Sequence, residues 1–283
     1  MSTLRRFSSQ FLGMNSTLIY EGGYGYLVDP GVFPHEVEKI RQSVLQKNIS
    51  ELTILLTHTH GDHISGWARF RDFPTYVHEA VKNKSEAVKA NDVKYLRGIL
   101  RKQNAGPDVP AEFPENPEYL RDGEKMEIPP FSFSFYHVPG HSADMSLVHI
   151  PELKLLFSGD MLIDSPVPFI LHNSLEYWDS LKKCKLICLE NDVQQLIPGH
   201  GKPARTFDEV LGRIEKEQLY LQKLVWEAIK LFRTGIPEAD LHAHLLQLAP
   251  GPAARFSHQT NVNTLLRDLN EWVNRESELT ITF

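Results

Sequence analysis

The feature that most constrains this chain is a series of four short motifs, each rich in histidine or aspartate and each placed directly after a predicted strand. They are THTHGDH at 57–63, PGHSAD at 139–144, FSGD at 157–160 and PGHG at 198–201. In the last three motifs a glycine adjoins the histidine or aspartate and allows the backbone to turn tightly there. Since all four follow strands, we expect them to gather at one edge of a sheet structure.

The residue types in these motifs are those that bind metal ions. His58 and His60 are two positions apart, so in an extended segment both imidazoles point the same way and can converge on one ion. Asp62 and His63 begin the next predicted helix and face a neighbouring position. This combination of imidazole and carboxylate suits zinc or another first-row metal. The later motifs supply three more candidate ligands, His141, Asp160 and His200.

The order of predicted elements indicates an α/β fold, a four-layer αββα sandwich. Short strand patterns lie at 16–20, 26–31, 51–57, 74–79, 131–138, 145–150, 154–159 and 194–197. Helical patterns lie at 34–48, 79–104 and 174–190, and a loop rich in proline and glycine is expected at 104–123. Helices between and after two blocks of strands favour two stacked sheets with helices outside. We predict this sandwich over 1–205 and a C-terminal helical extension over 206–283, with a strand-like end at 278–283.

The motifs THTHGDH, PGHSAD, FSGD and PGHG, in this order, resemble those of the metallo-β-lactamase superfamily over about residues 15–205. The resemblance implies two metal ions. One would be held by His58, His60 and His141, the other by Asp62, His63 and His200, with Asp160 as the bridge. It also implies that Asp29 is a buried aspartate that supports the ligand loops. In relatives with a long helical tail, the C-terminal helices cap or flank the active site.

The resemblance favours a hydrolase. With an aspartate at position 160, the chain is similar to thioesterases of the glyoxalase II type, lactonases, phosphodiesterases and nucleases, more than to true β-lactamases. Two neighbouring cations lower the pKa of a shared water toward ~7, which gives hydroxide at neutral pH. We therefore expect two zinc ions, or iron or manganese, and cleavage of a small ester, thioester or phosphodiester. Asp62 is the candidate proton carrier, and His172, which closes the apolar loop 164–173, is a candidate acid or substrate contact.

Two departures from the family pattern matter. Ser142, Ala143 and Asp144 follow His141 where many relatives have Ser/Thr-Pro-Gly, so Asp144 either supports the ligands or faces the substrate. The tyrosine that lactonases often place after the bridging aspartate has no counterpart in MLIDSPVPF, which argues against a lactonase.

Two other functional classes stay open at this point. The first is an oxidoreductase with a single iron, similar to persulfide dioxygenases of the same fold, although seven ligands favour two metals. The second is a ligand-binding regulatory protein that retains metal but turns over little substrate. The number and identity of the bound metal ions distinguish the hydrolase from the oxidoreductase. The rate of substrate turnover distinguishes the hydrolase from the regulatory protein.

Composition limits the partners. The chain has a formal net charge of −6, which argues against a nucleic-acid partner. Residues 79–105 are locally basic, and Lys89, Lys94, Arg97 and Arg101 are candidates to steer a small anionic substrate, although a solvated helix face explains them equally well. The two cysteines provide no disulfide framework, and no apolar run suits a signal peptide or a membrane span. We expect a cytoplasmic protein and leave its oligomeric state open.

Overall fold

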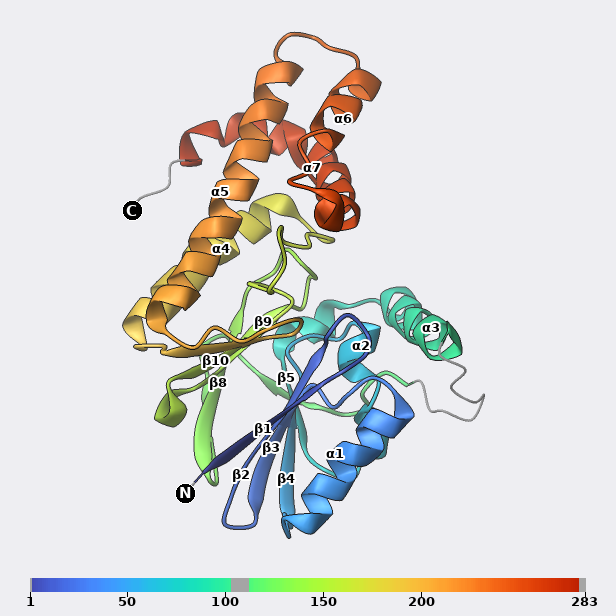
Figure 1. Cartoon of the computed structure of the whole chain (residues 1–283), viewed down its shortest axis with the longest axis vertical. Helices are drawn as coiled ribbons and strands as arrows, with labels where there is room; N and C mark the ends of the chain where they lie inside the picture. Colours follow the sequence, from blue (N-terminus) through green and yellow to red (C-terminus); the bar gives the residue numbers. More distant parts are fainter. Residues whose placement is uncertain (1, 103–111, 280–283) are drawn as a thin grey trace.

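Two sheets stack face to face in the computed structural model, which describes residues 2–102 and 112–279 (Figure 1). The first sheet has the order β1-β2-β3-β4-β5-β6 and the second β11-β10-β9-β8-β7. The strands of the first sheet are β1 (Thr3–Ser8), β2 (Asn15–Glu21), β3 (Tyr24–Val28), β4 (Glu51–Leu55), β5 (Thr75–His78) and β6 (Glu118–Leu120). Those of the second are β7 (Lys125–Ile128), β8 (Phe131–His137), β9 (Ser146–Ile150), β10 (Leu155–Gly159) and β11 (Gln195–Pro198).

Helices cover the outer faces of both sheets, which confirms the αββα sandwich. They are α1 (Pro34–Gln46), α2 (Gly61–Ile64), α3 (Glu86–Lys102), α4 (Ser174–Glu190), α5 (Phe207–Phe232), α6 (Glu238–Leu246) and α7 (Arg255–Asn274). Tyr26 and Phe133 belong to the apolar layer between the sheets. Ile40 of α1 and Leu96 of α3 pack against the first sheet, and Trp178 of α4 packs against the second. Each sheet is thus apolar on both faces.

The sequence prediction was wrong at four places. It predicted no strand at Lys125–Ile128, which forms β7 and pairs antiparallel with β8. It missed β1, an exposed strand at the edge of the first sheet that has no apolar alternation to reveal it. It assigned a loop where β6 and its short parallel pairing with β5 occur. It also predicted one helix over 79–104, whereas Glu79–Asn83 forms a separate 3₁₀ turn before α3 begins. The predicted strand-like end lies outside the described residues from position 280 onward.

The C-terminal segment is helical, as predicted. Thr206 begins α5 as its N-cap, since its side-chain oxygen accepts a hydrogen bond from the backbone N–H of Glu209. Leu221 of α5 and Trp272 of α7 share one apolar cluster with Trp178 of α4, so the extension packs on the outer layer of the second sheet. Whether residue 205 marks a domain boundary stays a prediction. Among the described residues, no helix is long and apolar enough to cross a membrane.

Candidate metal centre

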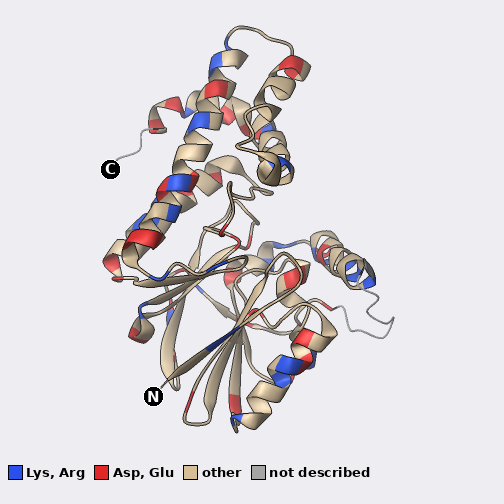
Figure 2. Cartoon of the chain, in the orientation of Figure 1, with Lys and Arg blue, Asp and Glu red and all other residues tan. Residues whose placement is uncertain are grey.

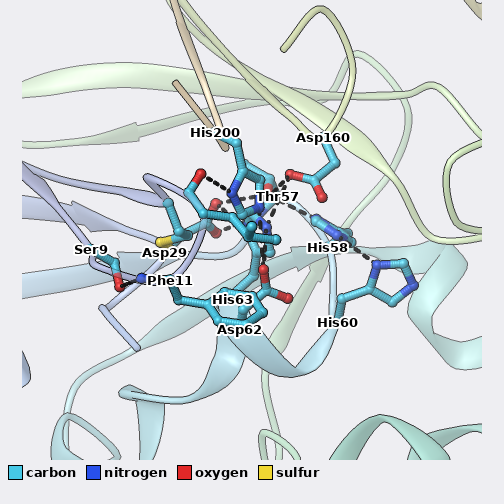
Figure 3. A network of polar contacts seen from close by, with 12 residues as sticks. Ser9, Phe11, Asp29, Thr57, His58, His60, Asp62, His63, Asp160 and His200 are labelled. Atoms are coloured by element: carbon cyan, nitrogen blue, oxygen red, sulfur yellow. Dashed lines mark hydrogen bonds and ion pairs between the residues drawn. The ribbon is translucent and has the colours of Figure 1, made fainter. Parts of the chain in front are cut away.

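The four motifs lie together at one end of the sandwich, as the sequence predicted. The loop after β4 carries His58 and His60, and α2 carries Asp62 and His63 (Figure 3). The three remaining side chains come from the turns after other strands. His141 follows β8, Asp160 follows β10 and His200 follows β11. Strand order therefore brings together side chains that are up to 142 positions apart in the sequence (58 to 200).

Three histidines form the first group of possible metal ligands. Nδ1 of His60 lies 3.1 Å from Nε2 of His58 and 2.9 Å from Nε2 of His141. Burial lowers the pKa of all three imidazoles, to about 4 for His141, so at neutral pH they are uncharged and have free lone pairs. Nitrogens around a tetrahedral zinc ion are about 3.3 Å apart. The spacing therefore fits three ligands of one ion.

Asp62, His63 and His200 form the second group. The Asp62 Oδ2 atom is 3.2 Å from Nε2 of His200 and 3.8 Å from Nε2 of His63. Asp160 lies between the groups, with Oδ1 3.1 Å from Nε2 of His63 and Oδ2 3.3 Å from Nε2 of His141. The seven side chains thus lie together, with the carboxylate of Asp160 next to both groups; their roles as ligands stay a prediction.

Hydrogen bonds on the far side of the rings orient three of these histidines. Nδ1 of His63 contacts Oδ2 of Asp29 at 2.9 Å, and Nδ1 of His141 contacts the carbonyl oxygen of Phe169 at 2.6 Å. Nδ1 of His200 contacts the carbonyl oxygen of Leu12 at 3.1 Å. In each ring Nδ1 faces an oxygen acceptor, so Nε2 of the ring points into the cluster. The supporting role expected for Asp29 agrees with this contact.

Two buried atoms at the centre lack hydrogen-bond partners among the described residues. They are Nε2 of His63 and Oδ1 of Asp160. A buried polar atom without a hydrogen-bond partner lowers the stability of the folded protein, and it does so more when it faces another acceptor atom. A cation between these atoms would remove that cost. The donor set, made of imidazoles and carboxylates, is the one that zinc, iron and manganese accept.

A cleft of about 520 Å³ opens beside the three-histidine group. His60 and His141 line it on the side of the metal centre, and Val88 lines it from α3. His172 lines it from the loop before α4, as the sequence suggested, and its Nε2 atom lies 3.2 Å from Oε2 of Glu176. The cleft therefore connects the proposed ligands to His172.

The predicted steering residues lie outside this cleft. Figure 2 shows blue segments along α3, but none of Lys89, Lys94, Arg97 and Arg101 is among the described residues that line the cleft. The lysine that does line it is Lys84, which sequence reasoning did not single out. Nothing distinguished Lys84 from the other lysines of this basic segment before its long-range contacts were known.

The C-terminal helices reach the metal centre through the loop between β10 and α4. The Asn261 side chain of α7 accepts a hydrogen bond from the backbone N–H of Ile170 at 2.8 Å and donates one to the carbonyl of Pro168 at 2.9 Å. Between these two residues stands Phe169, whose carbonyl contacts His141. Since no described residue beyond Glu176 lines the cleft, α7 supports the site from behind and does not contribute to the cleft wall.

Comparisons with known proteins agree with this geometry. The family model described as "Metallo-beta-lactamase superfamily" matches residues 10–200. The probable metallo-hydrolase YqgX of Bacillus subtilis (strain 168) is 33% identical over 144 residues, 50% of this chain and 62% of that protein. The match thus spans less than two thirds of that relative.

Two solved structures are also similar. A metallo-beta-lactamase family protein of Thermus thermophilus superposes with a TM-score of 0.64 at 19% identity, covering 95% of this chain and 93% of that one, which shows a common fold. TTHA1623, solved in a di-iron-bound form, gives a TM-score of 0.52 at 26% identity and covers 72% of this chain and 96% of that one.

Proposed function

The chain belongs to the metallo-beta-lactamase superfamily, and we propose that it is a two-metal hydrolase that cleaves a small ester, thioester or phosphodiester. The observation that carries this proposal is the position of Asp160, whose two oxygens lie 3.1 Å from His63 and 3.3 Å from His141. One carboxylate thus joins two groups of ligands. The similarity to a probable metallo-hydrolase supports the hydrolytic class.

Two divalent ions fit the residues present. His58, His60 and His141 would hold one, and Asp62, His63 and His200 the other, with Asp160 shared. We favour zinc, with iron or manganese as alternatives, because all three accept imidazole and carboxylate; the di-iron form of TTHA1623 supports the number two. When bound, such ions supply hydroxide at neutral pH and stabilise negative charge on a substrate oxygen.

The chain's own residues would bind the substrate and carry protons. Asp62 is the proposed proton carrier, because its carboxylate is part of the cluster and lies 3.2 Å from His200. A cleft of about 520 Å³ suits a small molecule better than a nucleic acid. We propose an anionic substrate because α3, which supplies part of one wall, also carries Lys94, Arg97 and Arg101 outside the cleft, and these charges make the local field positive.

Metal content and turnover test the proposal together. We expect protein purified without chelator to hold about two ions per chain, as elemental analysis would show. Hydrolysis of p-nitrophenyl acetate, a simple thioester or bis-p-nitrophenyl phosphate should stop after dialysis against EDTA and return when metal is restored. Hydrolysis that survives full chelation would contradict the proposal. One iron per chain, with oxygen uptake on a persulfide, would support the oxidoreductase alternative in its place.

His172 offers a separate prediction. If its imidazole protonates the leaving group, His172→Ala should lower kcat by about a hundredfold for a poor leaving group such as an alkoxide, and much less for p-nitrophenolate. Metal content should not change, because His172 belongs to neither of the two ligand groups. His242→Ala, on α6 and bonded to Asn263, is the matched control. Equal losses with both leaving groups would show that His172 transfers no proton.

A further inference from the structure

Two buried aspartates hold the residues on either side of His58 in the same manner. Asp29 accepts hydrogen bonds from the backbone N–H of Thr57 at 3.0 Å and from its hydroxyl at 2.8 Å. Asp144 accepts hydrogen bonds from the backbone N–H of Thr59 at 2.9 Å and from its hydroxyl at 2.6 Å. The two aspartates are 2% and 0% exposed. Each threonine is therefore fixed at both its backbone and its side chain by one carboxylate.

The two aspartates connect to different parts of the centre. Asp29 contacts Nδ1 of His63 at 2.9 Å, and Thr57 Oγ1 lies 3.2 Å from Nδ1 of His58. Asp144 stands three positions after His141, so its bonds to Thr59 join the turn of His141 to the loop that carries His60. The Asp29 contacts therefore act on His58 and His63, whereas the Asp144 contacts act on His60 and His141.

Lys84 completes the arrangement around Asp144. Its Nζ atom donates hydrogen bonds to Thr59 Oγ1 at 2.7 Å and to Asp92 Oδ2 at 2.9 Å, and lies 3.1 Å from Asp144 Oδ1. The Lys84 side chain is only 5% exposed. A buried ammonium is stable only when its N–H groups are paired. Here the ammonium makes two hydrogen bonds and one ion pair within the protein, so Lys84 is held by this cluster.

The contacts of Lys84 also reach the wall of the cleft. Asp92 is on α3, and Lys84 stands two residues before α3 begins. The same helix packs closely on the metal loop, because a Cβ on Gly61 would come within 2.8 Å of Leu96. One buried cluster thus ties α3 to the segments that carry His60 and His141.

We propose that Asp144, Thr59 and Lys84 form a positioning clamp for the three-histidine metal position, distinct from the contacts that Asp29 makes around His63. This inference rests on the proposed function, since it requires that the histidines bind metal. None of the three is in a ligand group, so they are positioning residues and act through His60 and His141. The clamp would hold the spacing of these two rings, whose facing nitrogens are 2.9 Å apart.

Zinc affinity measured at one position at a time tests the clamp. In a His200→Ala background the three-histidine group stays complete. In a His60→Ala background the group of Asp62, His63 and His200 stays complete. Thr59→Val, which replaces the hydroxyl with a methyl group, should weaken zinc binding about tenfold or more in the first background and less than about threefold in the second. Competition with a chromophoric chelator gives both dissociation constants. Thr59→Ser, which keeps the hydroxyl, should restore the affinity.

Controls separate positioning from a general structural effect. Thr17→Val is matched, because the buried hydroxyl of Thr17 has no hydrogen-bond partner among the described residues, and it should change neither dissociation constant. If Thr59→Val does not fold, Asp144→Asn takes its place with the same expected pattern. Equal weakening in both backgrounds, or none in the first, overturns the clamp while the proposed function stands. A parent protein that binds no zinc, iron or manganese overturns both.

Discussion

Asp160→Ala is expected to lower metal occupancy at both positions and to reduce kcat/KM for ester hydrolysis by at least about a hundredfold. The side chain lies 3.1 Å from Nε2 of His63, 3.4 Å from Nε2 of His200 and 3.3 Å from Nε2 of His141. It is the carboxylate within reach of both ligand groups. Without it, two neighbouring cations would repel each other with less negative charge between them.

Elemental analysis and steady-state kinetics on the same sample measure this effect. Asp160→Asn is the sharper variant, since it keeps the shape and removes the charge, and we expect it to lose metal as well. Asp208→Ala is a suitable control, because Asp208 is exposed in the first turn of α5. Two ions retained by both Asp160 variants would mean that Asp160 is not a ligand, and the shared-carboxylate proposal would be wrong.

The grouping of the candidate ligands could be predicted because its signals are local. His58, His60, Asp62 and His63 stand within six positions, directly after an apolar strand, and the three other side chains each follow a strand beside a glycine. The strands β10 and β11 and the helix α4 were predicted for the same reason, since their apolar patterns are clear within short windows. Where a pattern lies in neighbouring residues, the sequence alone is sufficient to predict the element or the candidate ligand.

The supporting contacts could not be predicted in this way. Thr59 and Asp144 are 85 positions apart and Lys84 is 25 from Thr59, and no motif marks any of them as a partner of the others. Asp144 was noticed only as a departure from the family pattern. Its burial at 0% exposure, together with its hydrogen bonds to Thr59, favours the supporting role over contact with a substrate.

The basic residues of α3 show how helical geometry limits a prediction from composition. Leu96, Ile99 and Leu100 are buried and fix the face of α3 that packs on the first sheet. Lys94 and Arg97 stand beside this stripe and are exposed, so their charges face solvent outside the cleft. Counting charges in a segment gives the sign of the local field but not the direction in which individual side chains point.

A single methyl group added at position 199 is expected to lower kcat/KM almost as much as the loss of the Asp160 side chain. A Cβ on Gly199 would lie 2.4 Å from Oδ1 of Asp160 and 2.8 Å from Cε1 of His63. The backbone cannot move away easily, because the N–H of Gly199 bonds to the carbonyl of Gly159 and its carbonyl accepts the N–H of Asn15. The two proposed ligands would therefore have to shift.

Gly199→Ala should thus lower kcat/KM by about a hundredfold, the usual cost of misplacing reacting groups by about 1 Å, and should weaken metal binding. Circular dichroism should stay that of a folded protein, since the methyl group meets the centre and not the core between the sheets. Gly212→Ala is the matched control: nothing lies within 4 Å of its added Cβ, and alanine favours the helix α5 there. A Gly199→Ala protein with two ions and full activity would show that this turn is free to move, and that the positions of Asp160 and His63 do not depend on a glycine between them.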